Sequence, residues 1–253
     1  MKKVALFIVI FGLLVCGQAQ KSFTFTYSKI MLDSTYRNQP DNPMVKILKP
    51  YKKLHDREMS IVIGEAEEIL KSQPPQSPLS NLCTDVLFEA TNRYCELHQL
   101  PLVDLSLLNF GGIRDSLLQG PITIGKIYVI SPFDNYLCII ELKGSTLQEI
   151  FSQFTSTRNQ PYSHAKINYK EHKPAQIWVN GAPLDPNKNY RLATVDFIRN
   201  GGDNIIPNSQ NIKDKNVITT KLILRELIID HIKNLTAAGM KLSKQLDDRA
   251  VIE

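Results

Sequence analysis

Two residues, Asn180 and Gly181, restrict the fold of this chain more than any other short segment. They lie between the β-prone runs AQIWV and APL, and an Asn-Gly pair in that setting predicts a tight β-hairpin. Because such a hairpin joins antiparallel strands, a purely parallel sheet is excluded. Other apolar runs typical of strands alternate with amphipathic segments typical of helices. We therefore predict an α/β fold of the mixed α+β type.

The strongest helix signal begins at Ser77. Ser77 can cap a helix, and Pro78 suits the first helical position because its missing N–H would have no intrahelical partner there. Apolar residues then recur every three or four positions and form one face: Leu79, Leu82, Cys83, Val86, Leu87, Ala90 and Tyr94. This pattern predicts a long helix with one buried face.

Shorter patterns predict further elements. Helices are expected over residues 44–56, on either side of Pro50, and over residues 145–155 and 224–235. Ser145 and Gln148 have the spacing of a capping box, which indicates where the second of these helices begins. Strands are expected within residues 58–70 and over residues 103–107 and 190–198.

The first 50 residues are expected to precede the folded domain, which we place at 51–253. Lys2 and Lys3, an apolar run ending at Val15 and then small residues form the pattern of an export signal, assigned to residues 1–19. Cys16 offers a lipoprotein alternative, but Val15 is bulkier than such sites prefer, so we favour a periplasmic or secreted protein. Residues 20–50 are expected to be irregular because NQPDNP interrupts any periodicity.

Cysteine usage and charge exclude two classes of protein. Cys83 and Cys95 are too far apart to pair, about 18 Å along one predicted helix. With Cys138 as the third remaining cysteine, a hydrophobic core and not a disulfide framework must hold the fold. The formal net charge of +5 falls by two without the export signal, and acidic and basic residues are mixed. This pattern does not indicate a nucleic-acid partner.

No segment has the pattern of a catalytic or metal site. The five histidines are scattered, without HxH or HExxH spacing, and neither a G-x-S-x-G elbow nor a Walker A loop occurs. We expect the histidines to be surface or capping residues. A Ser-His-Asp triad stays open, because its members need not be close in sequence. The apolar run in residues 1–19 is too short to span a bilayer.

The loop NFGGIR carries the first group of candidate binding residues. Gly111 and Gly112 let the backbone approach a ligand, and Asn109 offers both a donor and an acceptor. Arg114 adds a planar fork for hydroxyls or a carboxylate. The alternative is a tight turn followed by a surface arginine.

Two more loops follow apolar runs and carry the other candidates. Phe133 lies in SPFDN, where it is either a core residue or an exposed stacking face. Phe197 and Asp203 flank the glycine pair of DFIRNGGD, and Asp203 could accept from a diol or cap a turn. Three loops that combine glycine or proline with an aromatic or charged residue favour one shared pocket.

The order of these motifs resembles the C-terminal domain of the 5′-nucleotidase family. The segments that carry the resemblance are NFGGIR, PF-x-N, L-x-G-x-x-L and F-x-x-x-GGD, within residues from Ile61 to Leu235. The resemblance implies a four-layer sandwich of mixed sheets flanked by helices, which binds the nucleoside half of a nucleotide. It also implies that Phe133 and Phe197 stack on the base, that Asn109 hydrogen-bonds it, and that Arg114 and Asp203 hold the ribose hydroxyls.

Three departures from the family pattern qualify the functional prediction. A ribose-binding arginine expected before Asn81 is missing from SQPPQSPL, and Phe110 replaces a glycine within the first loop. The metallophosphoesterase signatures D-x-H, G-D-x-x-D and G-N-H-[DE] are also missing, and the roughly 40 residues before the match are too few for that domain. We therefore expect no metal cofactor in this chain and no nucleotide hydrolysis by it alone.

Three hypotheses follow. The first is a substrate-recognition subunit for nucleotide catabolism, completed by a separate exported metallophosphoesterase chain that holds two divalent metals. The second is a stand-alone module that binds nucleosides or nucleotides. The third is a scaffold whose pocket is vestigial, consistent with the missing arginine. Retention of the candidate binding residues argues against the third, and an exposed apolar patch would favour the first.

Overall fold

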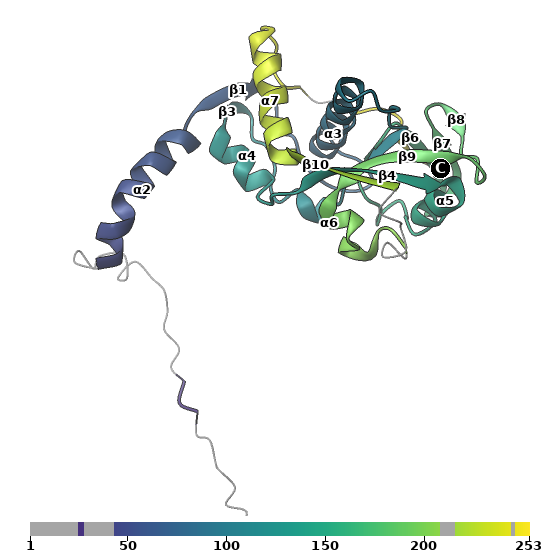
Figure 1. Cartoon of the computed structure of the whole chain (residues 1–253), viewed down its shortest axis with the longest axis horizontal. Coiled ribbons are helices and arrows are strands. Elements are labelled where there is room, and N and C mark those ends of the chain that lie inside the picture. Colours follow the sequence, from purple (N-terminus) through teal and green to yellow (C-terminus); the bar gives the residue numbers. More distant parts are fainter. Residues whose placement is uncertain (1–24, 28–42, 208–215, 244–245) are drawn as a thin grey trace, which may run out of the picture. The chain divides into compact units, whose positions relative to one another are not determined.

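A computed structural model describes residues 25–27, 43–207, 216–243 and 246–253 (Figure 1). The predicted export signal at residues 1–19 lies outside these residues. The chain divides into two compact units, residues 1–49 and residues 50–253. All described strands belong to the second unit.

Helix α2 (Pro43–Met59) differs from the sequence prediction in two ways. It begins inside the segment 20–50 that was expected to be irregular, and it continues through Pro50. The fixed φ of proline favours the first helical position, which explains the start at Pro43. The same φ fits a helix interior, so Pro50 costs one backbone hydrogen bond without forcing the helix to end.

Three sheets form the strand framework of the second unit. A two-stranded sheet pairs β1 (Val62–Ala66) with β3 (Gly120–Thr123) in antiparallel fashion. A five-stranded sheet has the order β10-β4-β9-β2-β5, with β2 parallel to β9 and the other neighbours antiparallel. Its strands are β2 (Leu105–Leu107), β4 (Tyr136–Lys143), β5 (Tyr162–Ser163), β9 (Asn189–Val195) and β10 (Val217–Ile223).

The third sheet contains the predicted hairpin. Its order is β11-β6-β7-β8, and β11 is parallel to β6. Its strands are β6 (Ala165–Lys170), β7 (Lys173–Val179), β8 (Ala182–Pro183) and β11 (Ala250–Ile252). Asn180 and Gly181 connect β7 to β8 with positive φ values of 51° and 75°, as a tight hairpin turn requires. The prediction of a mixed rather than parallel arrangement is confirmed.

Helices cover the five-stranded sheet. Helix α3 (Pro78–Leu97) packs on β2, β5 and β9, and α7 (Leu224–Ala237) packs beside α3 and against β10 (Figure 1). Helix α5 (Gly144–Ser152) contacts β4 and β7 and so connects the two larger sheets. The chain therefore has the predicted fold class, with mixed sheets flanked by helices.

The predicted face of α3 forms part of the core. Most of its apolar residues are buried, and the two others, Leu82 and Tyr94, pack against the core from its edge. The helix begins at Pro78 after Ser77, as predicted, and the backbone N–H of Ser77 donates to Oγ of Ser80 at 3.1 Å. The described cysteines, Cys83, Cys95 and Cys138, are buried and free, so the core carries the fold as expected.

Two predicted strands have different bounds in the structure. The strand expected within 58–70 is limited to β1, and the strand expected over 190–198 ends at Val195, where the short helix α6 (Asp196–Arg199) begins. The apolar run before the loop of residues 131–135 forms a helix, α4 (Ile124–Ile130). Thr123 caps α4 by accepting from the N–H of Lys126 at 3.2 Å.

The start of α5 shows why one capping prediction was wrong. The helix begins at Gly144, so Ser145 lies inside its first turn and not at the cap. The N–H groups of Gly144 and Ser145 donate to the carbonyl oxygens of Lys188 and Pro186, at 2.8 and 2.9 Å. A loop distant in sequence thus satisfies the helix terminus, and no capping side chain is required.

Candidate functional site

The three candidate loops meet at one cavity of about 250 Å³, hereafter the loop cavity. They follow β2, α4 and β9 along the chain. The cavity is lined by all seven candidate residues and one more: Asn109, Gly111, Gly112, Arg114, Phe133, Asn135, Phe197 and Asp203. The structure therefore brings these residues together around one cavity.

The structure of the first loop shows why it contains two adjacent glycines. Asn109 is buried, and the short 3₁₀ turn Phe110–Gly112 folds around its side chain. A Cβ atom on Gly112 would lie only 2.9 Å from Oδ1 of Asn109, and one on Gly111 would lie 3.2 Å from Nδ2. These glycines thus make room for the Asn109 amide as well as exposing backbone to the cavity.

Asn109 connects the first loop to the third. Its Nδ2 donates to Oδ2 of Asp203 at 2.7 Å, although the two residues are 94 positions apart. Asp203 has a positive φ of 54°, a conformation that aspartate tolerates better than most residues. One amide proton and the Oδ1 acceptor of Asn109 are not used in this contact, so polar groups remain for a ligand.

Two aromatic rings face the solvent side of the cavity. Phe133 is 46% exposed and Phe197 is 43% exposed, so neither is the core residue that an isolated phenylalanine would more often be. The backbone of Gly202 supports the Phe197 ring: a Cβ atom on Gly202 would lie 2.4 Å from it. Asp196 fixes the start of this loop, since its Oδ1 accepts from the N–H groups of Phe197 and Tyr136 at 2.9 and 3.0 Å.

A buried arginine that sequence reasoning missed holds the second loop. Arg225 of α7 donates to the carbonyl oxygens of Ser131 and Phe133, at 3.3 and 3.4 Å, and to Oδ1 of Asp134 at 2.5 Å. Its guanidinium also lies 4.1 Å from the centre of the Tyr128 ring. Burial alone would lower the pKa of Arg225, but Asp134 raises it above the ordinary value. A cation on the buried face of an amphipathic helix is the signal that could have identified it.

Arg114 is exposed and stays close to its own loop. Its Nη1 donates to the carbonyl oxygen of Gly111 at 3.1 Å, and its backbone N–H donates to Ile130 at 2.8 Å. One of the five guanidinium N–H donors is therefore used, which leaves the remaining donors for a ligand. Asn135, the other missed residue, belongs to the PF-x-N motif and could have been chosen from it.

The two local departures from the family pattern have clear structural outcomes. No residue of the segment 72–79, which lacks the expected arginine, lines the loop cavity. Gln76 of that segment instead donates to the carbonyl oxygen of Asp247 at 2.7 Å and accepts from Asn81 at 3.2 Å. Phe110 is half-buried and lines a neighbouring cavity of about 450 Å³, so its ring does not fill the loop cavity.

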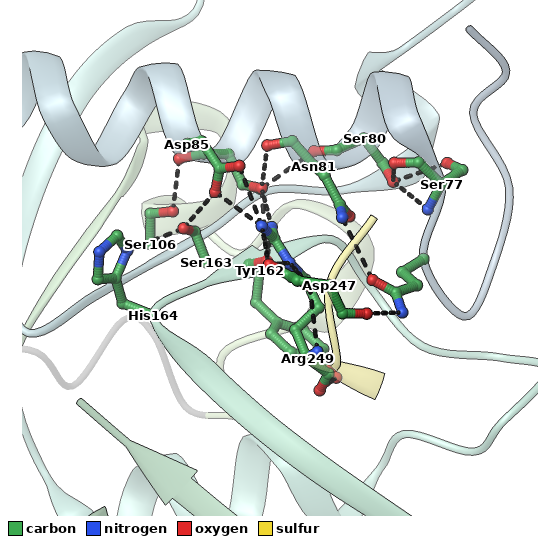
Figure 2. Close-up of polar contacts among 12 residues, drawn as sticks. Ser77, Ser80, Asn81, Asp85, Ser106, Tyr162, Ser163, His164, Asp247 and Arg249 are labelled. Atoms are coloured by element: carbon green, nitrogen blue, oxygen red, sulfur yellow. Dashed lines mark hydrogen bonds and ion pairs between the residues drawn. The ribbon is translucent and has the colours of Figure 1, made fainter. Parts of the chain in front are cut away.

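A second polar cluster lies under α3 and holds the C-terminal segment (Figure 2). Arg249 is buried and donates to both carboxylate oxygens of Asp85 at 3.0 Å, to Asp247 at 2.7 Å and to the carbonyl oxygen of Tyr162 at 2.8 Å. Burial would lower the pKa of Arg249, but the hydrogen bonds to Asp247 and Asp85 raise it. These contacts make Arg249 a structural cation.

The same cluster excludes one catalytic arrangement that the sequence left open. Ser163 donates its hydroxyl proton to Asp85, and its Oγ lies 2.9 Å from Nδ1 of His164 (Figure 2). In a catalytic triad the histidine lies between serine and aspartate, whereas here the serine lies between the other two. Asp85 therefore bonds Ser163 and not the second nitrogen of His164, so it cannot orient that ring as a general base for Ser163. Within the described ranges, no three His, Cys, Asp or Glu side chains are placed to hold a metal ion.

Comparison with known proteins assigns the fold and the loops to one family. Residues 62–209 match the family profile described as "5′-nucleotidase, C-terminal domain". The chain belongs to this family. A 5′-nucleotidase precursor from Thermus thermophilus has the same fold, with a TM-score of 0.66 and 26% identity over 82% of this chain.

Two curated relatives share this 5′-nucleotidase C-terminal domain. Endonuclease YhcR of Bacillus subtilis is 32% identical over 169 residues, 63% of this chain and 13% of YhcR. Cell wall protein Lmo0130 of Listeria monocytogenes is 28% identical over 193 residues, 70% of this chain and 24% of Lmo0130. The chain spans 42% of the Thermus structure, so it corresponds to less than half of each relative. In the part of the chain that is described, no helix has the length and apolarity needed to cross a membrane.

Proposed function

We propose that this chain binds the nucleoside half of a nucleotide in the loop cavity and is the substrate-recognition part of a 5′-nucleotidase-type hydrolase of nucleotide catabolism. The observation that supports this most is the convergence of seven residues, chosen from three distant sequence segments, on one cavity. A vestigial pocket would not be expected to keep two exposed aromatic rings beside a paired amide and carboxylate.

The chemistry of the cavity suits a nucleoside. Exposed rings at Phe133 and Phe197 offer stacking surfaces, each worth about 1–3 kcal/mol per base and tolerant of base identity. The amide of Asn109 suits the mixed donor and acceptor edge of a base. Asp203 and Arg114 supply an exposed carboxylate and a guanidinium fork, which suit the vicinal hydroxyls of ribose.

We further propose that a separate metallophosphoesterase chain supplies the catalytic metals. Phosphate-ester hydrolysis of this kind needs two metal ions to activate water and stabilise the leaving oxygen. Helix α2 supports a protein partner, because no residue of it is buried. Five of its exposed apolar residues lie at helical spacing and form one stripe: Met44, Ile47, Leu48, Tyr51 and Leu54. Such a stripe is typical of a contact surface.

An exported location is also part of the proposal. It rests on the export pattern in residues 1–19, and the relative Lmo0130, a cell wall protein, supports it. A reporter fusion tests this directly: the first 19 residues should direct a passenger protein across the inner membrane, and the same fusion without them should stay inside the cell.

The binding proposal is tested by calorimetric titration of the mature protein with adenosine, AMP and 2′,3′-dideoxyadenosine. Adenosine and AMP should bind saturably without release of phosphate. Loss of both ribose hydroxyls should weaken binding by at least about 10–150-fold, since each hydrogen bond to a charged group contributes about 1.5–3 kcal/mol. Asp203→Asn, which can keep the contact with Asn109 and tolerates positive φ, should reduce this difference.

The outcomes separate the hypotheses. Binding without phosphate release, followed by release when a metallophosphoesterase chain and a divalent metal are added, supports the recognition subunit. Binding that no such chain converts into hydrolysis supports a stand-alone module. If adenosine does not bind at about 1 mM, even with the partner chain present, the proposed site is wrong.

A further inference from the structure

A second large cavity lies on the outer face of the four-stranded sheet and is distinct from the loop cavity. Its volume is about 800 Å³, and we call it the sheet cavity. The β6–β7 register places Lys166 opposite Trp178 and Asn168 opposite Gln176. Because side chains alternate along a strand, these four lie on one face, while Ile167 and Val179 are buried on the other. The sheet cavity therefore has a floor made of four paired side chains.

Trp178 is the one tryptophan of the whole chain, and it lies in this floor. It is only half-buried, although an aromatic residue of this size normally contributes to a core. No hydrogen bond of its indole N–H to another described residue is found. The ring thus offers a flat apolar surface and an unused donor to the cavity.

Three amide side chains surround the tryptophan. Asn168, Gln176 and Asn180 all line the sheet cavity, and within the described residues none of their side chains forms a hydrogen bond. The Oδ1 atom of Asn168 is buried and unpaired in that part of the chain. Buried polar atoms are nearly always paired in native proteins, so an unpaired one calls for a partner that the described residues do not supply.

The charges of the sheet cavity cancel. Lys166 forms an ion pair with Asp248, and these are the two permanently charged side chains among the lining residues. His164 also lines the cavity, and its ring stacks on Phe88 with 3.4 Å between ring centres. A phosphate or another strongly charged ligand would find no uncompensated cation here. The cavity instead suits a neutral ligand with many hydroxyl groups.

We propose that the sheet cavity binds a neutral saccharide. One face of a pyranose ring carries C–H groups that can stack on Trp178, and its hydroxyls match amides that both donate and accept. The volume lies within the usual range of ligand sites, about 300–1,000 Å³, and accommodates more than one sugar ring. This site is independent of the nucleoside proposal, because the two cavities share no lining residue.

The single tryptophan provides a direct readout. Intrinsic fluorescence of the mature protein is measured during titration with chitotetraose, cellotetraose and maltotetraose. At least one of the three should cause a saturable change, with a dissociation constant at or below about 1 mM. If none does so, the proposal is wrong. A saturable fluorescence change with adenosine instead would mean that Trp178 serves nucleoside binding and would also overturn it.

Variants separate a binding role from a structural one. Trp178→Ala and Gln176→Ala should each weaken saccharide binding, measured by calorimetry, at least about tenfold. The matched control Lys173→Ala, on the same strand but outside the cavity lining, should leave it unchanged. Trp178→Phe keeps an aromatic platform and should retain part of the affinity if Trp178→Ala fails to fold. All four variants should bind adenosine as the parent does. If Gln176→Ala and Trp178→Phe both bind the saccharide as tightly as the parent, the assignment is wrong.

Discussion

Replacement of Phe197 by alanine tests whether its ring belongs to the binding site or to the core. The ring is 43% exposed and rests on the backbone of Gly202. If it stacks on a base, its loss removes about 1–3 kcal/mol of binding free energy, an increase in Kd of about 5–150-fold. A fully buried phenylalanine would cost about 3–5 kcal/mol of stability when truncated. Since this ring is little more than half covered, we expect about 1–2 kcal/mol, or a Tm lower by a few degrees.

The assay pairs adenosine calorimetry with thermal unfolding of the same samples. Tyr136→Ala is a matched control, because Tyr136 is similarly exposed and its backbone N–H keeps the bond to Asp196 after truncation. It should lower Tm slightly and leave the Kd for adenosine unchanged. A Tm loss above about 10 °C for Phe197→Ala, with an unchanged Kd, would show that the ring is core and that the loop cavity is not a stacking site.

Three further predictions concern the first loop, helix α2 and His164. Gly112→Ala should weaken adenosine binding about tenfold with little loss of Tm, because the new Cβ would displace the Asn109 amide; calorimetry and unfolding on one sample check this. Tyr51→Glu should weaken capture by the metallophosphoesterase chain in a pull-down while leaving adenosine binding intact, whereas Lys53→Gln, an equal change in charge, should not. Burial lowers the pKa of His164 in the folded protein, so folding favours the neutral ring. The stability that the neutral ring contributes is therefore present above the ordinary pKa near 6.5 and is lost as the pH falls. His164→Asn, which tolerates the positive φ, should therefore show a smaller fall in Tm between pH 7 and pH 5, and an equal fall would contradict this reasoning.

Local chemistry predicted the elements whose termini are set by neighbouring residues. The hairpin at Asn180 and Gly181 needs only two residues with positive φ, and the start of α3 needs only Ser77 and Pro78. The start of α5 depends on carbonyl groups of a loop more than 40 residues later in the chain, which no local pattern contains. The start of α5 was placed wrongly because distant backbone groups fix it.

The residues around the loop cavity also include some that the sequence could identify and one that it could not. Its lining residues were identifiable because glycine pairs, exposed aromatics and charged side chains recur together after apolar runs. Arg225 could not be linked to the loop of Phe133 from sequence, because the two are 92 positions apart and, apart from the bond to Asp134, its contacts with this loop run to backbone carbonyl groups. Any residue type presents a carbonyl, so such a contact leaves no mark on the identity of its partner.

The contacts around the loop cavity affect the order in which the proposed recognition chain would bind its ligand and its partner. Asn109 and Asp203 hold the first and third loops together, and Arg225 fixes the second loop to α7. All of these contacts lie within the unit of residues 50–253. A pocket organised before binding loses less conformational entropy when the ligand enters. A recognition chain of this kind could therefore capture a nucleoside first and meet its catalytic partner afterwards, an order that binding measured with and without the partner would reveal.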